Sequence, residues 1–129
     1  MSSKPVRPTE SELEILTVLW SRGPSTVREV YEVLRKRRKS AQYATVLKFM
    51  QIMAQKGLLK RDESDRAHIY APIHSRELIQ QQLAKDLLQR GFDWSMKNLM
   101  IGALSARKAT KEELAELRKL LDEYEGGKQ

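Results

Sequence analysis

The chain has 129 residues, 40% hydrophobic and 32% charged, with a formal net charge of +7 at pH 7. A chain of this length buries about two-thirds of its unfolded surface, which allows a modest core but excludes a large catalytic domain. It has no cysteine, which excludes a disulfide framework and a thiolate metal site. No run approaches the roughly 18 apolar residues of a membrane-spanning helix, and the start "MSSKPVRPTE" lacks an apolar signal segment. We therefore expect a cytoplasmic protein without membrane insertion.

Two amphipathic helices are predicted in the first third of the chain. Apolar residues at helical spacing predict the first over residues 8–20 and the second from Val27, with Gly23 and Pro24 between them. Each helix opens on a capping box, in which two side chains satisfy unpaired backbone N–H groups. The capping pairs are Thr9 with Glu12 and Thr26 with Glu29. The second helix ends in five consecutive cations, Arg35 to Lys39.

A third helix is predicted over residues 41–55, ending at Lys56 and Gly57. Its apolar face runs through Tyr43, Val46, Met50 and Met53, and the opposite face is small near its start and then polar and cationic. The major groove of DNA admits a helix only where the facing side chains do not collide with base edges, so this outer face suits base recognition. We expect base contacts from Gln42, Ala44, Thr45 and Lys48.

The positive charge is concentrated in the N-terminal part. Residues 1–75 hold 14 Lys and Arg against 8 Asp and Glu, whereas residues 76–129 hold 10 against 9. A localised positive field favours a polyanionic partner, because neutralising phosphates releases condensed counterions. Such contacts position a protein on DNA and do not read its sequence. We expect phosphate contacts from Arg35, Lys36, Arg37, Arg38, Lys39, Tyr43 and Arg66.

Two short strands, over residues 58–61 and 67–71, are predicted next, joined by a polar turn and closed by Pro72. A two-stranded hairpin is marginal in water, so it must pack on the helices. Three helices followed by a hairpin are typical of a winged helix-turn-helix domain, which we place at residues 1–74. Whether Arg66 at the hairpin tip contacts DNA stays open.

Residues 75–129 are predicted to be helical. Ser75 opens a helix that ends at Gly91, Asp93 opens a helix that carries Trp94, and Thr110 with Glu113 caps the last one. No other domain is visible to cover their apolar faces, so a second copy of the chain is the economical partner. We expect dimer contacts from Leu83, Leu87, Trp94, Leu99, Met100, Leu104, Leu114, Leu117 and Leu121.

Converging catalytic groups are lacking. His68 and His74 do not stand at a metal-ligand spacing from nearby carboxylates. Most carboxylates lie in first turns or beside Lys and Arg on helix faces, where capping and pairing account for them. The chain has neither a glycine loop for phosphates nor a nucleophile elbow. We expect no enzyme, no metal site and no cofactor.

Four segments together resemble the penicillinase-repressor family of BlaI/MecI/CopY-type transcriptional regulators: "TESELEILTVLW", "STVREVYEVL", "YATVLKFMQIMAQKGLLKR" and "DRAHIYAP". The similarity continues through "RGFDWSMKNLM" and "KATKEELAELRKLL". It implies dimeric repressors whose winged helices bind palindromic operators. It also implies a switch, in which a sensor-protease signal leads to cleavage in the dimerisation region. The family's cleavage pair, asparagine and phenylalanine, falls on Asn98-Leu99 here, so its second residue differs.

The sequence thus predicts a mainly α fold with a small β-hairpin, in which a winged-helix domain is followed by a helical dimerisation arm. The predicted function is that of a homodimeric repressor that binds a palindromic operator in double-stranded DNA. Two alternatives remain. One is an architectural or RNA-directed binder without operator specificity, although the exposed aromatic platform expected for single strands is lacking. The other is a protein-interaction adaptor, for which the N-terminal charge has no explanation.

Overall fold

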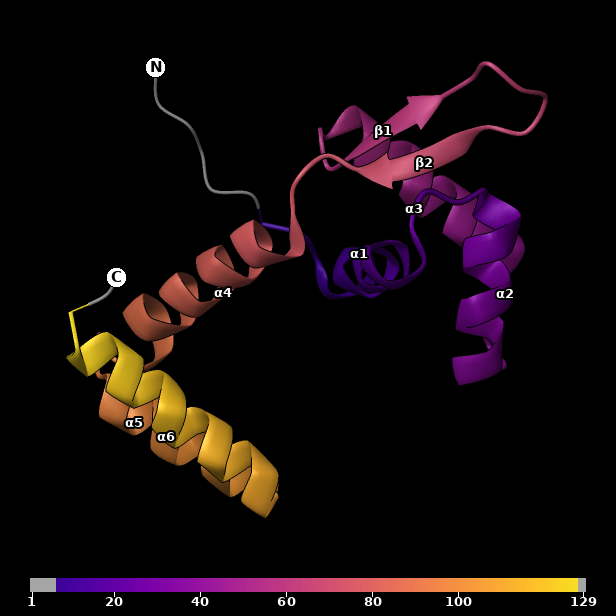
Figure 1. The fold of residues 1–129 in the computed structure, drawn as a ribbon. Helices are drawn as coiled ribbons and strands as arrows, with labels where there is room; N and C mark the ends of the chain where they lie inside the picture. Colours follow the sequence, from indigo (N-terminus) through magenta and orange to yellow (C-terminus); the bar gives the residue numbers. More distant parts are fainter. Residues whose placement is uncertain (1–6, 128–129) are drawn as a thin grey trace. The chain divides into compact units, whose positions relative to one another are not determined.

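The computed structural model describes residues 7–127. The chain forms two compact units, and the boundary between them in the sequence lies between Lys85 and Asp86. Residues 1–6, which belong to the segment expected to lack a signal peptide, lie outside the described residues. The first unit contains three helices and a hairpin (Figure 1). These elements are α1 (Glu10–Arg22), α2 (Val27–Arg37), α3 (Tyr43–Gln55), β1 (Leu59–Asp62) and β2 (Ile69–Pro72). The C-terminal helices are α4 (Arg76–Gly91), which crosses the division, α5 (Met96–Ala106) and α6 (Lys111–Glu125). The predicted winged-helix boundary at residue 74 precedes the start of α4 by two residues.

The core of the first unit is built from α1, α2, α3 and the hairpin. The apolar face predicted for the third helix is confirmed at Val46, Met50 and Met53, which are all buried. Tyr43 departs from that prediction because its side chain is 37% exposed. The buried cluster consists of Ile15, Leu16, Val18, Leu19, Val27, Val30, Leu34, Val46, Met50, Met53, Leu58, Leu59 and Tyr70.

The hairpin is antiparallel and is tied to the segment before α2. Its register pairs Leu59 with Pro72 and Asp62 with Ile69. Pro72 is the last residue of β2, and the two strands begin at Leu59 and Ile69, later than the predicted residues 58 and 67. Ser25 and Tyr70 exchange two backbone hydrogen bonds, of 3.0 and 2.8 Å. The hairpin therefore packs on the helices, as its marginal stability alone requires.

The N-termini of α1, α2, α4 and α6 follow the predicted capping signals. The three predicted capping boxes form in α1, α2 and α6, and the Ser75 hydroxyl accepts a hydrogen bond from the Leu78 N–H in the first turn of α4. The prediction for α5 is wrong, since its cap is Ser95 and not Asp93. Asp93 and Trp94 have φ values of 49° and 65°, in the left-handed region. A left-handed turn cannot be part of the helix, so α5 begins only at Met96 and Trp94 precedes it.

The second unit has no fully buried side chain among its described residues, 86–127. Its large apolar side chains are exposed or half-buried; the exposed ones are Leu87, Trp94, Met96, Met100, Ile101, Leu104, Leu120, Leu121 and Tyr124. Between residues 7 and 127, no helix combines the length and the apolar character that crossing a membrane requires.

Candidate nucleic-acid interface

One face of α3 is exposed where the sequence predicts base contacts. Ala44, Thr45 and Lys48 lie on this face, opposite the buried residues of the same helix. Gln42 is the N-cap residue, in extended conformation, and its side chain makes no capping hydrogen bond. Its amide therefore keeps both hydrogen-bond donors and its acceptor for another partner. All four predicted base-contact residues are brought together at the start of α3.

The C-terminal end of α3 is fixed to the beginning of α1. The Lys56 Nζ lies 2.9 Å from each carboxylate oxygen of Glu12, and one of these oxygens also accepts the Thr9 N–H at 2.9 Å. The Glu12 residue is only 3% exposed, so the pair is shielded on its carboxylate side. This contact holds the orientation of α3 relative to α1.

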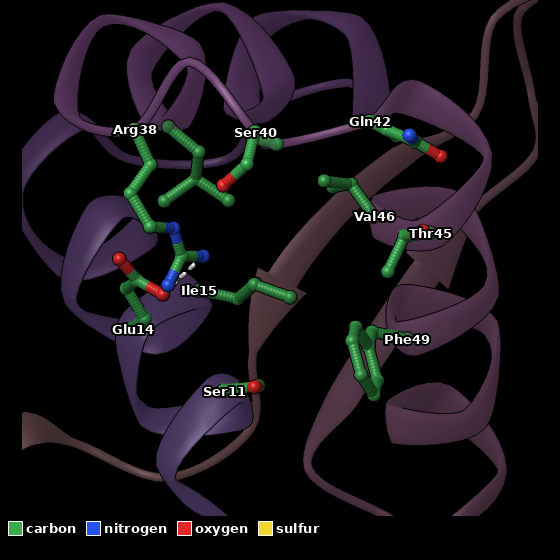
Figure 2. A pocket seen from close by; sticks show the side chains of 11 residues that line it. Ser11, Glu14, Ile15, Arg38, Ser40, Gln42, Thr45, Val46 and Phe49 are labelled. Carbon is green, nitrogen blue, oxygen red and sulfur yellow. Dashed lines mark hydrogen bonds and ion pairs between the residues drawn. The ribbon is translucent and has the colours of Figure 1, made fainter.

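The five-cation run does not form one uniform surface. Arg35 pairs with Glu32 at 2.8 Å, and its hydrogen bond lowers the pKa of that carboxyl group. Arg38 follows α2 and pairs with Glu14 of α1 at 2.9 Å (Figure 2). Within the described part of the chain, Lys36, Arg37 and Lys39 make no ion pair within 4 Å. Two of the five charges are therefore partly neutralised by ion pairs within the chain.

A depression of about 250 Å³ flanks α3 on the α1 side (Figure 2). Thr45 and Phe49 line it from α3, and the Arg38–Glu14 pair lies at its opposite wall. The paired charges largely cancel, so this flank of α3 offers little net attraction to phosphate. Its polar rim includes Ser40 and Gln42.

Tyr43 is held in an aromatic cluster that sequence analysis missed. Its ring makes a T-shaped contact with the Tyr31 ring, at a centroid distance of 5.7 Å and an interplanar angle of 83°. The Arg28 guanidinium lies 4.7 Å from the Tyr43 centroid and 5.8 Å from the Tyr31 centroid. Helical spacing places Arg28 and Tyr31 on one face of α2, but their contact with Tyr43 depends on the packing of two helices.

The wing, which is the hairpin of β1, β2 and the turn between them, carries further cations. Arg66 is exposed in the turn between the strands, and Arg61 of β1 pairs with Glu63 at 2.6 Å. The pKa of Arg61 is raised, first by a hydrogen bond to Tyr70 and then by the charge of Glu63. The Asp62 carboxylate accepts the Ser64 N–H, which lowers the pKa of Asp62 and fixes the start of the turn. The wing base is thus ordered by local contacts.

The predicted dimer residues divide by exposure. The exposed group contains Leu87, Trp94, Met100, Leu104 and Leu121, and the partly buried group contains Leu83, Leu99, Leu114 and Leu117. Asn98 and Leu99 lie in the first turn of α5, where the Asn98 N–H donates to the Ser95 hydroxyl at 3.0 Å. The predicted cleavage bond is therefore helical, and a protease needs this turn to unwind.

Comparison with known proteins identifies the family of the chain. The sequence matches the penicillinase repressor family over residues 8–123. It is 36% identical over 126 residues to the transcriptional regulator BlaI of Mycobacterium tuberculosis, covering 97% of this chain and 90% of that protein. It is 21% identical over 123 residues to the penicillinase repressor of Staphylococcus aureus, covering 95% and 97% of the two chains.

Solved structures agree on the fold. A MarR family protein from Bacillus stearothermophilus superposes with a TM-score of 0.54 at 15% identity, covering 96% of this chain and 76% of that chain. A transcriptional regulator from Thermotoga maritima gives a TM-score of 0.51 at 20% identity, covering 92% and 74%. The predicted mainly α fold with a winged helix is confirmed, as is the expectation of a regulator in place of an enzyme. The chain belongs to the penicillinase repressor family of DNA-binding transcriptional regulators.

Proposed function

We propose that the chain represses transcription in the cytoplasm as a homodimer that binds a palindromic operator, with α3 of each copy in a major groove. The exposed face of α3 carries the proposal, because its small and polar side chains lie directly opposite the buried face that orients the helix. Two copies bound to successive turns of the duplex block access to the promoter.

Direct readout is assigned to the start of α3. The Gln42 amide suits adenine, which presents an acceptor and a donor in the major groove, and Lys48 suits the acceptors of guanine. Thr45 reaches a thymine methyl group or a phosphate, and Ala44 leaves room for close approach. The cations of the basic run and Tyr43 are assigned to phosphates. Among these cations, Lys36, Arg37 and Lys39 form no ion pair within residues 7–127, so their charge is available to the DNA backbone.

The homodimer is supported by the second unit. Its exposed apolar side chains need a cover, and a second copy supplies the same apolar faces in a self-complementary arrangement. Joining two winged helices makes the second half-site contact intramolecular, which raises avidity without a new DNA contact. Cleavage at Asn98-Leu99 by a regulatory protease would remove this gain and release the operator.

Duplex selection tests the specificity. The full chain is used to select duplexes from genomic fragments, and its affinity for them is compared with that for bulk duplex and RNA at several salt concentrations. We expect a preferred palindromic duplex. Equal affinity for all duplexes, or preference for RNA, would contradict the repressor assignment.

Substitutions on α3 separate base contacts from phosphate contacts. Thr45→Ala and Lys48→Ala should change the relative affinity among operator variants, costing about 1–3 kcal/mol where a base contact is lost. Arg37→Ala should weaken binding to all duplexes alike and reduce the salt dependence. If both classes changed selectivity in the same way, the assigned roles would be wrong.

Sedimentation of the free protein tests the dimer. Leu121→Asp places a charge on an exposed apolar side chain of α6, and we expect it to shift the protein towards monomer. Lys119→Asp changes the charge of an exposed position on the same helix and serves as the control. A wild-type protein that stays monomeric at micromolar concentration would overturn the dimer.

A further inference from the structure

A second depression, which we name the wing groove, runs between the start of α2, α3 and the hairpin. It has a volume of about 400 Å³, and its polar lining includes Arg28, Tyr43, Gln51, Arg61, Arg66 and His68. No Asp or Glu belongs to its lining. The depression on the α1 side differs, because Glu14 lies in it beside Arg38. The wing groove is thus the flank of α3 whose lining includes three arginines and no carboxylate.

We propose that the wing groove seats a phosphodiester segment of the DNA duplex, with Arg28 as the residue that positions Tyr43 at its edge. This inference rests on the proposed function, since it assigns one backbone contact of the same complex. A helix in the major groove lies between two phosphate backbones, so phosphates must pass along its flanks. Tyr43, Leu47 and Gln51 line the groove at a spacing of four residues, so the groove follows α3 along its length.

The walls of the groove are held in place before any ligand binds. The backbone bridge between Ser25 and Tyr70 joins the start of α2 to β2, with hydrogen bonds of 3.0 and 2.8 Å. The side of α2 that carries Arg28 is therefore fixed to the strand that forms the opposite wall. A preformed site loses little conformational entropy on binding, which favours affinity.

The carboxylates near the groove orient its arginines without lining it. Glu32 lies 3.9 Å from Arg28, and Glu63 lies 2.6 Å from Arg61. A guanidinium has five N–H donors, so one such contact leaves others for a phosphate. Arg66 makes no ion pair in residues 7–127.

Arg28 has a role that its charge alone does not explain. Its guanidinium faces the Tyr43 ring at 4.7 Å, while Tyr31 packs against that ring in a T-shaped contact. A planar guanidinium stacks on an aromatic face, whereas a lysine ammonium supplies the charge without the plane. Arg28 therefore fixes the first residue of α3 and presents its hydroxyl to the backbone that passes through the groove.

Salt titration of the full chain tests the seat. The probe is the duplex that wild-type protein selects from a random-sequence library. Arg28→Ala and Arg61→Ala should each make the plot of log affinity against log salt shallower by about 0.9, because one phosphate contact is lost. Arg118→Ala, an exposed arginine of α6, is the matched control and should keep the wild-type slope. Arg28→Lys should keep the slope and weaken binding about two- to fivefold, since it loses only the stacking.

A second measurement works on the DNA and leaves the protein unchanged. Neutral methylphosphonate linkages are placed one at a time along the selected duplex. We expect one position at which neutralisation weakens wild-type binding but has little further effect on the Arg28→Ala variant. If no position shows this coupling, or both groove variants keep the wild-type slope, the groove is not a phosphate seat. A wild-type protein that selects no duplex would instead refute the proposed function, so the two failures are distinguishable.

Discussion

The two units of the chain are stabilised in different ways. The first has a buried core contributed by three helices and a hairpin, whereas no side chain is fully buried in the described part of the second. What the second unit has is local order: a capping box on α6, a serine cap on α5 and an ion pair between Arg107 and Glu113. A unit without a core cannot fix its shape by burial alone. The difference indicates that the first unit is fixed by its own core, and it supports the proposal that a second copy covers the apolar side chains of the second unit.

The largest expected effect comes from comparing one residue type in both units. Met50 is 0% exposed and Met96 is 74% exposed. Met50→Ala leaves a cavity in the core and should lower the free energy of unfolding by about 2–5 kcal/mol. Met96→Ala removes the same atoms from a solvent-exposed position, so it should change the free energy of unfolding little. Urea unfolding at low protein concentration measures both, and equal losses would contradict the contrast between the units.

The next effect concerns the ion pair that ties α3 to α1. Lys56→Ala leaves the buried Glu12 carboxylate with the Thr9 N–H as its remaining hydrogen-bond partner. We expect unfolding to become easier by about 1–3 kcal/mol, the range for a buried polar group that loses its partner. Arg35→Ala breaks the exposed pair with Glu32 and should cost far less. The prediction fails if the two variants unfold at the same urea concentration.

Most of the fold could be predicted because its signals are local. A capping box needs residues three apart, and both members of each pair stand in the sequence. The buried face of α3 follows from the spacing of Val46, Met50 and Met53. The composition of the opposite face then predicts a DNA-facing surface without knowledge of any distant contact.

The rest depends on residues that are far apart or on unusual backbone. Arg38 pairs with Glu14, 24 positions earlier, so a run that suggests five equal phosphate contacts contains a cation already paired within the chain. The stacking of Arg28 on Tyr43 requires the packing of α2 against α3. The left-handed residues Asp93 and Trp94 moved the start of α5, since neither residue type reliably signals a positive φ.

A smaller effect is expected at the caps, which matter most where no core exists. The Thr110 hydroxyl accepts the Glu113 N–H at 3.0 Å in the first turn of α6. Thr110→Ala should destabilise α6 by about 1 kcal/mol, seen as faster hydrogen exchange of its amides. Thr17→Ala removes a hydroxyl that bonds to the Leu13 carbonyl within α1, and should have almost no cost because alanine is the better helix former. Similar exchange in both variants would show that α6 does not depend on its cap.

The smallest effect is confined to acid pH. The pKa of Glu113 is lowered from 4.5 to about 2, first by the Arg107 guanidinium and then by the Thr110 N–H. A lowered carboxyl pKa contributes stability that is fully present above the unfolded value of 4.5 and is lost as pH falls towards 2. The first turn of α6 should therefore loosen over this window, whereas in Glu113→Gln it should be weaker throughout and insensitive to pH. Carboxyl NMR titration gives the midpoint, and a value near 4.5 would mean that the cap is not formed in solution. Because α6 has no buried side chain to hold it, its response to acid reports on the cap more directly than that of a helix packed in the core.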